Sequence, residues 1–145
     1  MVDPATPPKE LSNLVEITRL ALAVHTAAEA RVLELLLART NGPRALGMLV
    51  TQTRLEHIAQ RAGVDALTRI RPASIAWYEY ALELRVLVLD HAGRADQMRW
   101  TLEDHMPHGL HRVLGSEYAT ERLRVLGSTS PMIVAQRRDA ALARN

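Results

Sequence analysis

Residues 10–38 constrain the fold most, because this segment is apolar around most of its circumference when it is drawn as a helix. One face carries Leu11, Leu14, Val15, Thr18, Leu22 and His25, and Ile17, Leu20, Ala21 and Val24 widen it. Such a helix needs cover on more than one side, from its own chain or from a second one. Residues 26–29 have capping-box spacing, so we expect a break at Thr26 and a second helix over 27–38. One continuous helix over 10–38 is the alternative.

Composition agrees with a small helical protein. A chain of 145 residues suits one domain, and 48% of its residues are hydrophobic although it has no phenylalanine. The core must therefore come from aliphatic residues, of which leucine and alanine favour helices. A net charge of +2 is too small to indicate a nucleic-acid partner. The absence of cysteine excludes disulfides and cysteine-ligated zinc.

The amino-terminal residues and the hydropathy pattern predict a cytoplasmic protein without a membrane partner. Residues 1–9 contain three prolines and read as a flexible arm, without the apolar segment of a secretory signal. No apolar run approaches the roughly 18 residues that a membrane span needs.

Residues 55–70 carry a pattern typical of a helix-turn-helix. A second capping box over 53–56 opens a short helix that ends at Ala62, and Gly63 supplies the turn. Asp65 can then cap the next helix. Pro72 is expected to interrupt that helix, because a proline disfavours the helical conformation of the residue before it.

A β-hairpin is expected to follow. Residues 86–89 form a short β-leaning run, residues 90–94 have turn chemistry, and residues 97–101 can return as a second strand. A helix-turn-helix followed by a hairpin is a winged helix. The predicted fold class is therefore mostly α, a winged helix-turn-helix with a small β-hairpin wing and flanking N- and C-terminal helices.

The predicted domain organisation has three parts. Residues 1–9 are the arm, residues 10–127 are a winged-helix domain of dimerisation type, and residues 128–145 are a linker and a C-terminal helix. The linker is predicted around 127–131 because this stretch is rich in glycine, serine and proline.

The order of these elements resembles the N-terminal dimerisation domain of small-molecule O-methyltransferases, the S-adenosylmethionine-dependent type found in secondary metabolism. The similar segments are LALAVHTAAEARVLELLLA (20–38), LEHIAQRAGVD (55–65), LELRVLVLDHAGR (82–94), WTLEDH (100–105) and LGSEYATERLRVLG (114–127). The resemblance implies a homodimer with intertwined N-terminal helices, and later helices that cover the substrate pocket of a catalytic domain. Pro72 and the apolar segment 43–52 depart from the family's pattern.

The Rossmann-type catalytic domain of that family is absent from this sequence. No two of the seven glycines are two positions apart, so no G-x-G cradle for a cofactor can be written. The resemblance implies no cofactor in this chain, and S-adenosylmethionine only if a separate catalytic chain supplies its domain. The implied partners are a second copy, such a methyltransferase chain, and a small-molecule ligand. Whether the chain is an enzyme stays open.

The resemblance also implies four substrate-facing residues, Met106, His108, His111 and Tyr118. His105, His108 and His111 offer a metal motif instead, but the first and last diverge by roughly 120° around a helix axis. We therefore predict no metal ligands, and no spacing supports a catalytic group.

Two histidines lie elsewhere on predicted helices. We interpret His25 as a satisfied histidine of the core or an interface, and His57 as part of an exposed helix face.

Two alternatives of other classes remain. A winged helix can be a DNA-binding regulator. However, residues 65–70 offer only Arg69 to DNA, and Glu79 and Glu83 would be repelled by phosphates, so nucleic acid is the less favoured partner. The third hypothesis is a small standalone ligand-binding protein or enzyme that uses residues 100–118.

Overall fold

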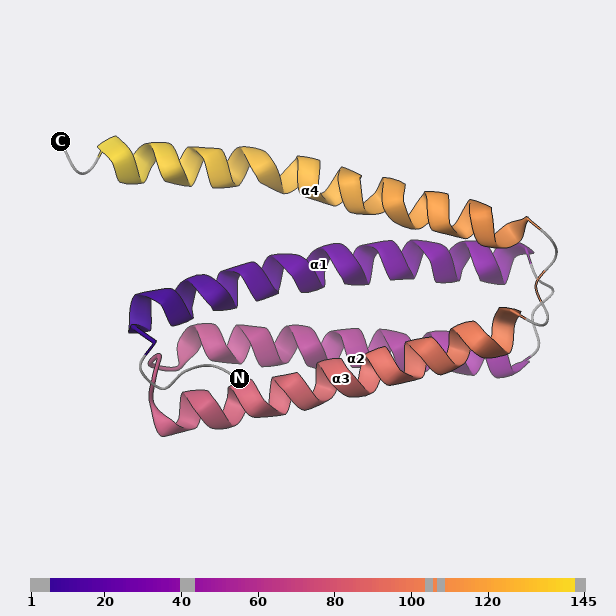
Figure 1. Cartoon of the computed structure of the whole chain (residues 1–145), viewed down its shortest axis with the longest axis horizontal. Helices are drawn as coiled ribbons and strands as arrows, with labels where there is room; N and C mark the ends of the chain where they lie inside the picture. The colour runs from indigo at the N-terminus through magenta and orange to yellow at the C-terminus, as the bar shows by residue number, and fades with distance from the viewer. Residues whose placement is uncertain (1–5, 40–43, 104–105, 107–108, 143–145) are drawn as a thin grey trace.

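The protein is an all-helical bundle in a computed structural model (Figure 1). Helix α1 spans Pro8–Arg39, α2 spans Arg44–Arg69, α3 spans Ile75–Glu103 and α4 spans Leu110–Leu142. The structure describes residues 6–39, 44–103, 106 and 109–142, and no strand occurs among them.

Alternating spacings of three and four residues place the buried side chains of α2 in one seam. They are Leu46, Val50, Thr53, His57, Gln60, Val64 and Leu67. The buried residues Trp77, Leu84 and His91 follow the same register along α3. This is the spacing at which long helices pack side by side in a bundle.

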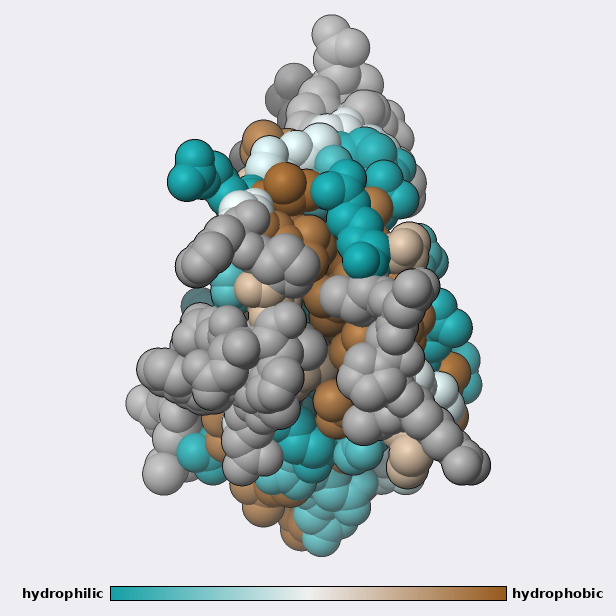
Figure 2. Space-filling view, turned by 90° about the vertical axis from the view of Figure 1, so that its right-hand side faces the viewer, coloured by the Kyte–Doolittle hydropathy of each residue, from teal (hydrophilic) through white to brown (hydrophobic). Residues whose placement is uncertain are grey.

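Two apolar clusters form the core, one toward each end of the bundle. The first contains Leu11, Val15, Val64, Leu67, Trp77 and Leu84, and the second contains Leu36, Leu46, Leu110 and Leu114. Figure 2 looks onto the end that holds the second cluster and shows hydrophobic residues through the middle of this face, with hydrophilic residues beside them. Between the clusters the seam turns polar, because buried Thr53, His57 and Gln60 follow one another along α2.

Helix α1 lies between its neighbours. It packs against α4 on one side and α2 on the other, and α2 packs in turn against α3 (Figure 1). Over the described residues, α4 packs along α1 and not along α2 or α3. The two-sided packing of α1 explains why its sequence is apolar around most of its circumference.

The predicted β-hairpin wing is wrong. Residues 86–89 and 97–101 both lie inside α3. The β-leaning run is helical because Val88 continues the register of Leu84 and His91 and packs against the first apolar cluster. This packing outweighs the weak β preference of valine. Both the resemblance to a methyltransferase dimerisation domain and the hypothesis of a DNA-binding regulator relied on this predicted wing, which is absent from the described residues.

The predicted helix-turn-helix is also wrong, because α2 runs through Gly63 and Asp65 without a turn. Gly63 has a packing role instead. A Cβ atom at this position would lie 3.2 Å from Leu84 Cδ1, so the glycine lets α3 approach α2 closely.

The break expected at Thr26 is wrong, and the continuous-helix alternative is confirmed by α1. Thr26 Oγ1 donates a hydrogen bond to the carbonyl of Ala23 in the preceding turn, so this side chain does not cap a helix. The interruption at Pro72 is confirmed, since this residue lies between α2 and α3. The segment 127–131, predicted as a linker, is part of α4.

Over the described part of the chain, none of the four helices has a stretch long and apolar enough to cross a membrane.

Candidate metal centre

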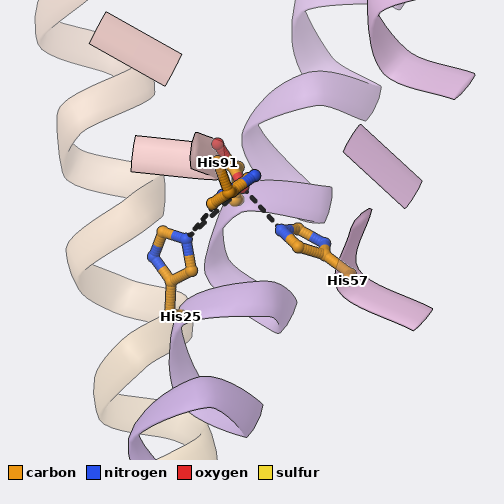
Figure 3. Close-up of side chains that lie close together, drawn as sticks. His25, His57 and His91 are labelled. Atoms are coloured by element: carbon orange, nitrogen blue, oxygen red, sulfur yellow. Dashed lines mark hydrogen bonds and ion pairs between the residues drawn. The ribbon is translucent and has the colours of Figure 1, made fainter. Parts of the chain in front are cut away.

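Four side chains that can bind a metal converge in the polar layer between the two apolar clusters. His25 and Glu29 come from α1, His57 comes from α2 and His91 comes from α3. The first two are four residues apart, so they share one face of α1. Figure 3 shows the three imidazole rings pointing toward a common centre. The ligand atoms of the four residues all lie within 4.8 Å of one another.

The distances among these atoms suit the ligand shell of one metal ion. Glu29 Oε2 lies 2.7 Å from His57 Nε2, 3.1 Å from His91 Nε2 and 3.5 Å from His25 Nε2. His25 Nε2 and His91 Nε2 are 3.1 Å apart. In a tetrahedral zinc site with bonds of about 2.0–2.1 Å, ligand atoms are separated by about 3.3 Å. The four residues therefore offer a compact set of three nitrogens and one oxygen.

Hydrogen bonds behind two of the imidazoles fix which nitrogen faces the centre. His91 Nδ1 donates to Glu56 Oε2 at 2.8 Å, and Arg94 Nε forms an ion pair with Glu56 Oε1 at 2.6 Å. His25 Nδ1 lies 3.1 Å from the hydroxyl of Tyr118 on α4. A metal-binding histidine commonly uses its second ring nitrogen in this way, because the outer bond orients the ring and leaves the other nitrogen free to bind.

The environment favours the protonation states that a metal ion needs. Burial lowers the pKa of His25; Glu29 opposes this, while His91, His57 and Arg122 lower it further. Burial raises the pKa of Glu29, but the hydrogen bond from His57 and the nearby His91 and His25 outweigh this, so the pKa lies below its ordinary value. A neutral imidazole and an ionised carboxylate are the forms that bind metal.

The ligand atoms of these four residues are close enough to repel one another where lone pairs face each other, and a positive charge among them relieves this repulsion. A neutral His91 that donates from Nδ1 presents a lone pair at Nε2; this lone pair can accept a hydrogen from His25 Nε2, but it also faces Glu29 Oε2, an ionised carboxylate oxygen that has no hydrogen to give. Lone pairs at these distances repel one another. Protons can relieve some of these contacts, whereas one cation at the centre relieves all of them together.

The predicted substrate-facing residues have different positions. Tyr118 contacts the cluster through His25. Met106 is half-buried against the second apolar cluster, and His111 is exposed on α4. His105 and His108 lie outside the described residues. Whether any of the four faces a substrate stays a prediction.

The sequence alone did not predict that these four side chains come together. His57 was expected on an exposed face, but its residue is 7% exposed, so this prediction is wrong. His25 does have hydrogen-bonding partners, as expected of a satisfied histidine. The overlooked signal was the spacing of His25 and Glu29, one helical turn apart on an apolar helix. Glu29 had been assigned to a capping box.

In comparisons with known proteins, no protein-family model, curated protein or solved structure matches the chain.

Proposed function

We propose that the protein binds one divalent transition-metal ion through His25, Glu29, His57 and His91, with zinc as the first candidate. The observation that carries the proposal is the convergence of four ligand atoms within 4.8 Å in the interior of the bundle. Imidazole nitrogens suit zinc, copper, nickel and iron, whereas calcium and magnesium prefer an all-oxygen shell. Four ligands from the protein match the coordination number of zinc.

The proposed ion would connect three of the four helices. Its ligands come from α1, α2 and α3, and Glu56 with Arg94 would hold the His91 ring in its binding orientation. Buried polar groups lose their hydration when the chain folds. An ion that binds all four ligand atoms would therefore stabilise the fold more in this buried layer than at the surface.

Titration of the metal-free protein with zinc in a calorimeter tests the proposal. We expect saturable binding of about one ion per chain, in line with one four-ligand site. His91→Ala should abolish this binding. Glu56→Gln should weaken it about 10- to 100-fold, because it removes a charged partner of a ligand. His111→Ala is the matched control, since His111 is exposed and outside the cluster. Equal binding by wild type and His91→Ala would overturn the proposal.

We also propose that the protein is a homodimer. The supporting observation is a row of exposed apolar side chains along α3, Ile75, Leu82, Val86 and Leu89, which are 81%, 58%, 50% and 56% exposed. Their spacings of seven, four and three residues place them on one face of the helix. Large apolar side chains exposed together on one helix face indicate a surface that a partner can cover. Light scattering at micromolar concentration should give twice the chain mass, and the mass of a single chain would contradict the dimer.

A further inference from the structure

A groove lies along the contact between α1 and α2, next to the candidate ligand His57. Its larger part has a volume of about 430 Å³. Three alanines of α1 line one side of this part, and α2 lines the other side with residues that include Arg54, His57 and Arg61. Among the described residues, the lining comes from α1 and α2 alone. A hollow of this size suits a small molecule.

His57 brings an unpaired ring nitrogen to this groove. Its side chain is 9% exposed, and its Nε2 atom lies 2.7 Å from Glu29 Oε2. Its Nδ1 atom lies on the side of the ring turned away from the common centre (Figure 3), and no hydrogen bond joins Nδ1 to another described residue. The described polar atoms that lack a partner and are sealed from solvent do not include this nitrogen. Nδ1 is therefore accessible from the groove that His57 lines.

The other two imidazoles have partners for the corresponding nitrogen inside the protein. Glu56 accepts a hydrogen bond from His91 Nδ1, and the hydroxyl of Tyr118 contacts His25 Nδ1. A histidine that binds a metal commonly donates from its second nitrogen to a carboxylate, a backbone carbonyl or a water. For His57 the described part of the chain supplies no such acceptor, so the acceptor has to come from the groove.

Metal binding changes what Nδ1 offers to the groove. In the metal-free protein, a neutral His57 that donates from Nε2 to Glu29 carries no hydrogen on Nδ1. An ion bound to Nε2 takes the place of that hydrogen, and the hydrogen of the neutral ring then lies on Nδ1. The nitrogen thus changes from an acceptor to a donor. The ion also places positive charge behind the ring, because Glu29 cancels only one of its two charges.

Two arginines flank His57 on the α2 side of the groove. Arg54 lies three residues before it and Arg61 four residues after it, so all three share one face of α2. Neither arginine belongs to an ion pair among the described residues. No acidic side chain is found among the described residues that line the larger part of the groove, and Asp65 lines the other part. This unpaired positive charge attracts an anion.

We infer that the groove binds a small organic carboxylate when the metal site is filled. One carboxylate oxygen accepts the hydrogen bond from His57 Nδ1, Arg54 and Arg61 donate further hydrogen bonds, and the alanines of α1 contact the apolar part of the ligand. Zinc and the carboxylate then each raise the affinity for the other. This inference rests on the proposed metal site and adds the class of ligand that its outer side recognises.

Calorimetric titration of the zinc-loaded protein with hexanoate tests the inference. We expect saturable binding of about one hexanoate per chain, in line with one groove. Binding to the metal-free protein should be about 10-fold weaker or more, because Nδ1 then has no hydrogen to donate. This sample must be dialysed free of EDTA, which is itself a carboxylate. Hexanol, which lacks the charge, and sodium chloride at equal ionic strength should give no saturable signal.

Two arginine variants locate the binding in the groove. Arg61→Ala should weaken hexanoate binding about 10-fold or more, the size expected for a lost charge-assisted hydrogen bond. Its zinc affinity without hexanoate should stay close to that of the wild type, because Arg61 is not a ligand. Arg69→Ala is the matched control, since it removes an exposed arginine of the same helix that does not line the groove.

The outcomes separate the two proposals. A protein that binds no zinc would overturn both. Zinc binding without saturable hexanoate binding would overturn the carboxylate site and leave the metal site standing. Equal hexanoate affinity with and without zinc would also overturn the carboxylate site, because His57 Nδ1 would then take no part. Equal losses in Arg61→Ala and Arg69→Ala would do the same, because they would show a general effect of positive charge.

Discussion

Addition of zinc is expected to raise the melting temperature of the metal-free protein by about 10 °C. A ligand that binds only the folded state stabilises it by about 4 kcal/mol when its free concentration is about 1,000 times its dissociation constant. For a chain of this size, each kcal/mol raises the melting temperature by about 2–4 °C. The unfolded chain separates His25 from His91 by 66 positions, so it cannot offer the same compact site.

Circular dichroism during heating, with EDTA or with a slight excess of zinc, measures this shift. His91→Ala should melt at the same temperature in both buffers, because it lacks one ligand and the hydrogen bond to Glu56. A wild-type protein whose melting temperature is the same with EDTA and with zinc would contradict the prediction. So would a shift of equal size in His91→Ala, since that would place the binding elsewhere.

Replacing Glu29 and His57 together by leucine is expected to abolish the response to zinc and leave the metal-free protein at least as stable as the wild type. The two side chains form a buried contact of 2.7 Å between Oε2 and Nε2. Replacing both partners of a buried hydrogen bond by apolar residues of similar volume is often nearly neutral or stabilising. Thr53, Gln60 and His91 would remain as the buried polar residues of this layer.

The single variant Glu29→Leu is the matched control, and its expected effect has the opposite sign. It leaves His57 buried without its carboxylate acceptor, and a buried donor left unsatisfied costs about 1–3 kcal/mol. Urea denaturation in EDTA gives the free energy of unfolding of each protein. A double variant that is less stable than the wild type would show that the polar layer stabilises the metal-free fold, contrary to this account.

Local sequence patterns correctly predicted that several segments are helical, but they often misplaced where the helices begin and end. The helical character of residues 10–38 and the interruption at Pro72 follow from residue spacing and proline stereochemistry, which need no knowledge of neighbours. The wing was wrong because the β preference of residues 86–89 is smaller than the packing energy that Val88 gains as part of α3. Gly63 was placed in a turn, but only the position of Leu84 reveals why a glycine is needed there.

The error at His57 has a related cause. The helix was expected to start near Arg54, so it left out the buried residues Leu46 and Val50, which begin the seam of α2 eight and four residues earlier. With the full length of α2 in view, His57 falls on the same face as these buried residues. The metal centre as a whole has no local motif, because its ligands come from three helices whose neighbours had to be known first. Tyr118 was singled out through the family resemblance, and its contact with His25 came from the structure.

The position of α4 has a consequence for how the molecule opens. Because α4 packs along α1 alone over the residues that the structure describes, it can separate without parting α1 from α2 or α2 from α3. A segment with fewer neighbours opens at lower free energy. Backbone amides of α4 would then exchange with deuterium earlier than those at the centre of α2. The four candidate ligands would remain together in the slower-exchanging part of the chain, while Tyr118 and Arg122 would leave and return with each opening of α4.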